Sequence, residues 1–321
     1  MSFLRYLGIA CLTVIAFALG GPAAHAQSGR TIKIVVPYPP GSGPDITSRL
    51  MAEQISRTHN VSMVVENRPG GGTLIGTEAA MRAAPDGNTV LLVANSFVIN
   101  PALKPQPYDV SGSFDPVCQL ATTPMVFVVQ GSSPYKKFDD LLAAARAKPG
   151  ELSFGTSPAS SLHVAVEVIK RAAKIDMTFV PYTGSGPAVN TLLGGHITSV
   201  MADYPTIVPH LKSGALRGLV TVSPKRVSEF PDIPTLIETK LSNYNAEIFY
   251  GMVVPAKTPP AATAQLADWF SAAMQAPDVK PKLAQQGLFS NVVCGKPFGE
   301  QMRKLVDEYT TIAREANIKM D

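Results

Sequence analysis

Two matching glycine-rich segments are the residues of this chain best suited to bind an anion. Residues 36–44 read Val-Pro-Tyr-Pro-Pro-Gly-Ser-Gly-Pro, and residues 180–187 read Val-Pro-Tyr-Thr-Gly-Ser-Gly-Pro. Each segment follows an apolar run typical of a strand and precedes the apolar spacing of a helix. Glycine and proline at such a turn leave backbone N–H groups pointing outward at the positive end of the helix dipole. We therefore expect both loops to favour a carboxylate or a phosphate.

An ordinary strand-to-helix connection also uses glycine and proline, and one such loop alone would favour that structural interpretation. Turn geometry does not require the same Gly-Ser-Gly-Pro run twice, so the repeat favours binding. A third segment between a strand and a helix, Gly155 to Ser157, adds two hydroxyls. Tyr38 and Tyr182 could flank a ligand or cover the strand ends, and Asp45 and Asp203 could equally cap helices or order loops. The expected ligand-binding residues are Tyr38, Pro40, Gly41, Ser42, Gly43, Asp45, Gly155, Thr156, Ser157, Tyr182, Thr183, Gly184, Ser185, Gly186 and Asp203.

Patterns of several catalytic and cofactor sites are missing from the sequence. A dinucleotide fingerprint beginning at Gly41 would need glycine at position 46, which is Ile46. The chain has no Walker-type lysine motif and no Gly-x-Ser-x-Gly nucleophile elbow. The five histidines lie too far apart in the sequence for metal-ligand spacing. We predict no catalytic residue, no metal and no cofactor.

Alternating strands and helices must position these loops. The first series has strands over 31–36, 61–65 and 89–94 and helices over 45–56 and 78–84. The second has helices over 138–147, 162–173, 188–194 and 205–213 and strands over 152–154, 177–180, 199–201 and 218–222. Such alternation predicts mainly parallel sheets covered by helices. Loops at the carboxyl ends of their strands form ligand sites, so the two loops would face each other across a cleft.

The end of the chain predicts a return to the first lobe, with a strand over 248–254 and helices over 261–276, 277–286 and 297–316. Crossovers near 118–129 and 245–254 would then act as a hinge. We expect lobe I to comprise 27–119 plus 247–321, and lobe II to be an insertion over 120–246.

Residues 1–26 have the composition of a signal peptide: Arg5, an apolar stretch over 7–19 and Ala24-His25-Ala26 before the cleavage site. We expect cleavage after Ala26 and a periplasmic protein that is not membrane-inserted, because no later segment is apolar over the ~20 residues needed to span a bilayer. Without residues 1–26, 27 basic and 24 acidic residues give a formal charge of +3. Since no basic stripe with aromatic residues is present, a nucleic-acid partner is not expected.

Cys118 and Cys294 remain after processing. In an oxidising compartment they could form a disulfide that closes a long loop, or they could be two separate buried thiols. The sequence leaves both interpretations open.

A further ordered set of motifs extends over essentially the whole mature chain. It comprises IVVPY at 34–38, GSGPD at 41–45, ENRPGGG at 66–72, IGTE at 75–78, APDG at 84–87, FDPV at 114–117, VPY at 180–182, LLGGH at 192–196, Asp203, PDIPT at 231–235 and VPA at 254–256. With these motifs the chain resembles the periplasmic solute receptors of tripartite tricarboxylate transporters, the Bug-type receptors. Each motif alone is weak, but the ordered set is specific.

The resemblance implies an α/β, type II periplasmic binding protein fold of two lobes with a two-crossover hinge. It also implies that main-chain groups and ordered water hold carboxylates. Pro44 stands where the family often has Thr, and Phe249 where it often has Trp, so side-chain specificity differs from the common pattern. Residues 66–70 are typical of the family, and we interpret them as architectural, a strand end that leads into a tight loop.

We therefore predict a monomeric receptor that captures a small organic acid without turnover and delivers it to the membrane components of a tripartite tricarboxylate-type transporter. An exported hydrolase or isomerase using Ser42, Ser185, Asp45 or Asp203 is an alternative, although no base accompanies a nucleophile. A sensory ligand-binding module is another. The sequence leaves open a tricarboxylate, an aliphatic or aromatic carboxylate, or an amino acid or other small polar nutrient.

Overall fold

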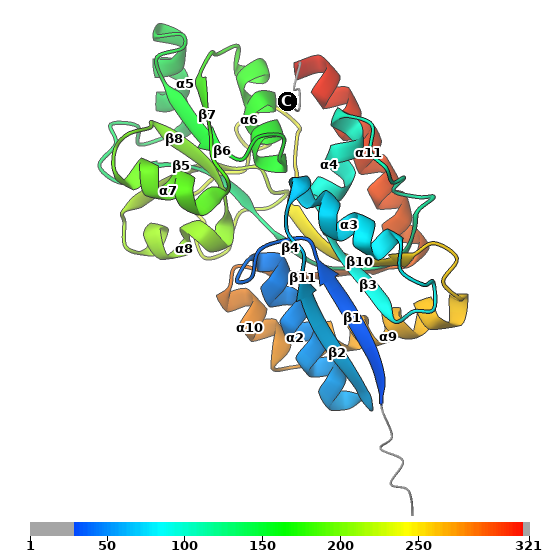
Figure 1. Ribbon diagram of the computed structural model, residues 1–321. Coiled ribbons are helices and arrows are strands. Elements are labelled where there is room, and N and C mark those ends of the chain that lie inside the picture. Colours follow the sequence, from blue (N-terminus) through cyan, green and yellow to red (C-terminus); the bar gives the residue numbers. More distant parts are fainter. Residues whose placement is uncertain (1–28, 317–321) are drawn as a thin grey trace, which may run out of the picture.

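Two α/β units make up the computed structural model, which describes residues 29–316 of the 321-residue chain (Figure 1). We call the unit built on the six-stranded sheet the first lobe and the unit built on the five-stranded sheet the second lobe. The expected signal peptide and its cleavage after Ala26 lie outside the described residues.

The first lobe has the strand order β11-β4-β10-β3-β1-β2. Its strands are β1 (Arg30–Val36), β2 (Val61–Asn67), β3 (Thr89–Ala94), β4 (Phe114–Thr123), β10 (Ile248–Pro255) and β11 (Phe289–Cys294). Its helices are α2 (Gly43–Thr58), η1 (Gly71–Thr73), α3 (Leu74–Met81), α4 (Asn95–Leu103), α9 (Pro260–Gln275), α10 (Val279–Gln285) and α11 (Lys296–Ala316).

The second lobe has the strand order β7-β6-β8-β5-β9. Its strands are β5 (Met125–Gln130), β6 (Ser153–Thr156), β7 (Thr178–Pro181), β8 (Ser199–Asp203) and β9 (Leu216–Thr221). Its helices are α5 (Phe138–Ala147), α6 (Ser161–Ala173), α7 (Ser185–Leu193) and α8 (Tyr204–Lys212).

Both sheets are mixed: the prediction of parallel pairing is confirmed for β1, β2 and β3 and for β6, β7 and β8, and it is wrong for the strands next to the crossovers. β1 pairs in parallel with β2 and β3, whereas β10 and β4 pair antiparallel with their neighbours, and β5 is antiparallel to β8 and β9. The cause is the crossover: β4 leaves the first lobe and β10 returns to it, so neither is joined to its neighbours by a β-α-β connection.

The crossover strands are nearly continuous. β4 ends at Thr123 and β5 begins at Met125, with Pro124 alone between them. All of β4 belongs to the first sheet, so the expected boundary between residues 119 and 120 falls inside a strand. The other expected boundary, between 246 and 247, lies just before β10.

Helix periodicity explains how the two lobes pack. On α6, the buried residues Leu162, Val166 and Ile169 recur at helical spacing and join the core of the second lobe. Val164, on another side of the same helix, is buried in a cluster of the first lobe that includes Phe97. α6 therefore belongs to one lobe and packs against the other.

The buried amide of Asn95 fixes the start of β10. Its Nδ2 donates to the carbonyl oxygen of Glu247 at 3.1 Å and to the hydroxyl of Tyr309 at 3.0 Å. Its Oδ1 accepts from the backbone N–H of Phe249 at 2.9 Å. One side chain thus links the beginning of α4, the returning crossover and α11.

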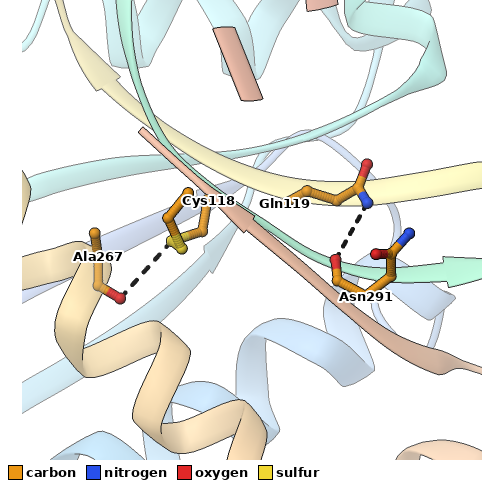
Figure 2. Close-up of a disulfide and its surroundings, with 5 residues drawn as sticks. Cys118, Gln119, Ala267 and Asn291 are labelled. Carbon is orange, nitrogen blue, oxygen red and sulfur yellow. Dashed lines mark hydrogen bonds between the residues drawn. A yellow bond between two sulfur atoms is a disulfide. The ribbon is translucent and has the colours of Figure 1, made fainter. Parts of the chain in front are cut away.

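Cys118 and Cys294 form a disulfide, which resolves the alternative that the sequence left open (Figure 2). The two residues are direct partners in the β4–β11 register, and Cys118 is fully buried. Its Sγ lies 3.7 Å from the carbonyl oxygen of Ala267 on α9, while Nε2 of the adjacent Gln119 donates to the carbonyl oxygen of Asn291 at 3.1 Å. The bridge fastens the edge strand β11 to the outgoing crossover strand.

Candidate functional site

The first glycine-rich loop turns sharply between β1 and α2. Gly41 has a φ of +78°, a conformation that favours glycine. The hydroxyl of Ser42 donates to the carbonyl oxygen of Pro39 at 2.7 Å, which closes the turn. Pro40 and Gly41 are exposed. α2 begins at Gly43, two residues before the expected start, with Pro44 as its second residue.

Asp45 is buried beneath this loop, and its carboxylate is fully engaged. Oδ2 accepts from the backbone N–H of Gly41 at 2.9 Å and from Nε of Arg49 at 3.0 Å, while Oδ1 accepts from Nδ2 of Asn67 at 2.9 Å. Burial alone would raise the pKa of Asp45, but the hydrogen bonds from Arg49, Gly41 and Asn67 outweigh it and the pKa is lowered. Asp45 therefore orders the loop through internal contacts.

Tyr38 covers the ends of neighbouring strands. Its hydroxyl is 2.6 Å from that of Ser96, at the start of α4. Burial raises the pKa of Tyr38 to about 12. Of the two roles that the sequence left open for Tyr38, this contact with Ser96 corresponds to the covering of the strand ends.

Backbone donors remain available at the start of α2. Within residues 29–316, the amide N–H groups of Gly43 and Asp45 have no protein acceptor. This is the expected state of the first helical residues, whose N–H groups have no partner within the helix.

The second glycine-rich loop has the same character with a shift of one residue. α7 begins at Ser185, so Pro187 is its third residue and not the first. Proline is tolerated there because the first-turn N–H groups need no helical acceptor.

Backbone donors also remain available at the start of α7. The N–H groups of Ser185 and Gly186 have no acceptor within residues 29–316. A Cβ added at Gly184 or Gly186 would meet no atom within 4 Å.

The third segment packs closely against the second. A Cβ at Gly155 would lie 2.8 Å from the ring of Tyr182, so the glycine makes room for that ring. The backbone N–H of Tyr182 donates to the carbonyl oxygen of Thr156 at 3.0 Å. The side chain of Thr156 is fully buried and its Oγ1 has no hydrogen-bond partner among the described residues, whereas Ser157 is half-buried.

Asp203 connects this group to the crossover. It ends β8, precedes α8 and pairs with Met125, the residue after the crossover. Its backbone N–H donates to Oγ of the buried Ser185 at 3.4 Å, and its Oδ2 accepts from the hydroxyl of Thr206 at 2.8 Å. The structure thus brings Asp203 together with the second loop. Thr183, in that loop, is exposed.

Sequence reasoning missed Tyr250. This residue lies on β10, opposite Ala94 of β3 and Ala121 of β4, so it reaches the edge of the sheet where the first loop begins. A Cβ at Gly43 would lie 2.6 Å from its hydroxyl oxygen. Burial, with the nearby Asp203 and Tyr38, raises the pKa of Tyr250 well above its usual value. The sequence did contain one signal that could have identified it: Tyr250 is a phenol within an apolar strand that lies beside an expected crossover.

The site is therefore rich in hydrogen-bond donors. Within residues 29–316, no group of three or more His, Cys, Asp and Glu residues could hold a metal ion. In the same range, no helix is long and apolar enough to cross a membrane.

Family models and curated proteins give a consistent result. A model described as "Tripartite tricarboxylate transporter family receptor" matches residues 47–318. Protein BugT of Bordetella pertussis is 31% identical over 292 residues, covering 89% of this chain and 90% of that protein. A Cupriavidus necator protein named for the gbd 5' region is 33% identical over 289 residues, with coverages of 88% and 87%.

Solved structures agree. One described as a periplasmic transporter is 33% identical, has a TM-score of 0.82 and covers 92% of this chain and 100% of its own. Periplasmic binding protein BugD is 26% identical with a TM-score of 0.80 and coverages of 91% and 99%. An R. palustris protein solved with adipate is 26% identical with a TM-score of 0.82 and coverages of 90% and 98%. The fold is thus that of a periplasmic binding protein, as predicted.

Proposed function

Because this chain belongs to the tripartite tricarboxylate transporter receptor family, we propose that it binds a small organic acid between its lobes and passes it to the membrane components of such a transporter. The observation that carries the proposal is the pair of helix N-termini, α2 and α7, each of which begins within a Gly-Ser-Gly-Pro run and presents N–H groups without an acceptor in residues 29–316. Such groups favour a carboxylate. The relative solved with adipate supports this choice of ligand class.

The ligand-binding residues proposed for this site are those of the three loops together with Asp203. Asp45 and Tyr38 support the first loop, and the backbone at Gly43 and at Ser185 to Gly186 supplies donors. The carboxylate would be held mainly by main-chain groups, because Arg49, a cation next to the first loop, is paired with Asp45 at 3.0 Å.

We propose ligand capture without turnover in the periplasm. The hydroxyl of Ser42 donates to a backbone carbonyl, and Oγ of Ser185 accepts from the backbone N–H of Asp203. Neither serine contacts a histidine or carboxylate base in the described part of the chain, so a hydrolase using these residues has no support.

The test is a thermal-shift screen of residues 27–321 against carboxylates, amino acids and neutral sugars, followed by calorimetry. A ligand at ~100 times its Kd should stabilise the protein by about 2.7 kcal/mol and raise the midpoint by several degrees. Binding confined to acids supports the proposal. Binding of no acid, or consumption of one, contradicts it. A pull-down with the receptor from detergent-solubilised membranes tests delivery of the ligand to a transporter. Recovery of transporter subunits would support delivery, whereas recovery of a sensor kinase would support a sensory role.

Gly186→Val tests the second loop. We expect binding to weaken at least tenfold, because the added side chain occupies open space beside the free N–H groups of α7 without displacing protein atoms. The fold should stay intact, as measured by circular dichroism and the melting midpoint. Ala143→Val, on the exposed face of α5 in the same lobe, is the control and should bind normally. Normal binding by Gly186→Val would place the ligand elsewhere.

A further inference from the structure

Tyr250 is a buried residue whose hydroxyl stays open to solvent and makes no hydrogen bond to the described part of the protein. The residue is 5% exposed, and its hydroxyl has no hydrogen-bond partner among residues 29–316. The other tyrosines near the first loop differ: Tyr38 contacts Ser96 at 2.6 Å, and Tyr108 donates to the carbonyl oxygen of Phe97 at 2.9 Å. The hydroxyl of Tyr250 is therefore the one of these three that a ligand could use without breaking a hydrogen bond within the described protein.

This hydroxyl faces the N-terminus of α2. The position that a Cβ of Gly43 would take is 2.6 Å from the hydroxyl oxygen and 3.1 Å from the Cζ atom. The amide N–H groups of Gly43 and Asp45 point from the same helix end and have no acceptor within residues 29–316. An O–H donor and free N–H donors therefore lie together, with the positive end of a 16-residue helix behind them.

Tyr250 also lies where the lobes meet. It is the third residue of β10, the strand by which the chain returns from the second lobe. Asp203, from the second lobe, and Tyr38, from the first, both act on its phenol electrostatically and favour the protonated form. Tyr250 is therefore a donor at neutral pH, beside the N-terminus of α2 and near Asp203 of the second lobe.

We propose that Tyr250 is a specificity-determining residue, whose hydroxyl donates a hydrogen bond to the ligand carboxylate at the N-terminus of α2. This inference rests on the proposed function and names one side chain that completes its site. Hydrogen bonds to charged acceptors contribute more than those to neutral acceptors, so this contact favours an acid over its carboxamide.

The experiment compares wild type, Tyr250→Phe and Tyr108→Phe by calorimetry with citrate, malate, adipate and terephthalate, and with the amide of whichever acid binds most tightly. We expect Tyr250→Phe to bind the acid at least tenfold more weakly, to discriminate less against the amide, and to keep its melting midpoint, because the hydroxyl makes no hydrogen bond to the described protein. Tyr108→Phe should bind normally with a lower midpoint, because it loses the hydrogen bond to Phe97.

Binding of the acid within twofold of wild type by Tyr250→Phe, with unchanged discrimination, would overturn this inference alone. Failure of wild type to bind any of the four acids would overturn the proposed function with it. A second readout uses the wild-type protein labelled with ¹³Cζ-tyrosine, and Tyr250→Phe serves only to assign the Tyr250 resonance. That resonance should shift when the acid is added to the wild type. A resonance that does not move would contradict the contact.

Discussion

The negative charge of Asp45 is compatible with the proposed anion binding at the first loop, because Asp45 is paired within the loop. Its oxygens accept from Gly41, Arg49 and Asn67, so the carboxylate stabilises the turn and its charge is compensated. The ligand is then met by backbone dipoles and, as we infer, by the phenol of Tyr250. At the scale of single residues, the loop thus uses the Asp45 carboxylate for its own structure, and its free N–H donors remain available for the carboxylate of the proposed ligand.

Asp45→Asn should lower the free energy of unfolding at neutral pH by ~1.5–3 kcal/mol, the usual range for hydrogen bonds to a charged group. Because the folded pKa of Asp45 lies below the unfolded value of 3.8, its contribution is present above that value and is lost as the pH falls through the folded pKa. Urea unfolding at several pH values should therefore show a smaller loss of stability below about pH 4 in the variant. Parallel curves for both proteins would contradict this role.

The sequence was enough to find the loops but not the partner of the first one. Local chemistry identifies a Gly-Ser-Gly-Pro turn, since strand, turn and helix are consecutive. Tyr250 lies more than 200 positions after that turn, and its place beside Gly43 depends on β10 pairing with β3. Asp45 was recognised as a loop-ordering candidate, but which of its two roles applies depends on Asn67, which a separate strand supplies.

Elements with their own periodicity were predicted well. The helix expected over 138–147 has those bounds, and the strand expected over 248–254 ends one residue later. The strands β4, β5 and β11 were not predicted, because β4 contains Pro116 and β11 is polar and exposed at the sheet edge. The strand character of β4 and β11 comes from pairing across the sheet, which a local pattern does not contain. β5 differs, because its apolar run MVFVVQ is itself typical of a strand and was assigned to the crossover instead.

The disulfide covalently joins the edge strand β11 to β4. It spans 176 positions of the sequence, so chain entropy assigns it about 5 kcal/mol, and native disulfides commonly contribute ~2–5 kcal/mol. Cys118→Ala with Cys294→Ala should lower the free energy of unfolding by that ~2–5 kcal/mol, measured by urea unfolding. Because Cys118 is fully buried, reductant should act slowly on the folded wild type and quickly in urea. Two titratable thiols in the oxidised, denatured protein would refute the bridge.

Two crossovers and the packing of α6 define how the lobes of the whole molecule can move. The chain passes out through Pro124 and back through residues 222–247, while α6 packs against α4 and α11 of the first lobe. The exposed pair Arg171 and Glu315, 3.0 Å apart, joins the same two surfaces but contributes little, as solvent-exposed pairs do. The buried apolar contact of Val164 is therefore the part of this packing between the lobes that we select for substitution.

Val164 and Val166 provide a matched pair for that test, since both are buried on α6 and face different cores. Each change to alanine removes two methyl groups, so both should lower stability by roughly 1.6 kcal/mol. Only Val164→Ala alters contact between the lobes. If the packing described here belongs to the ligand-binding arrangement, losing it shifts the population away from that arrangement and raises the apparent Kd. Calorimetry should therefore give several-fold weaker binding for Val164→Ala and wild-type affinity for Val166→Ala, with urea unfolding confirming equal losses of stability. Equal affinities would mean that the α6 contact is independent of ligand capture, and motion would then have to be assigned to the crossovers alone.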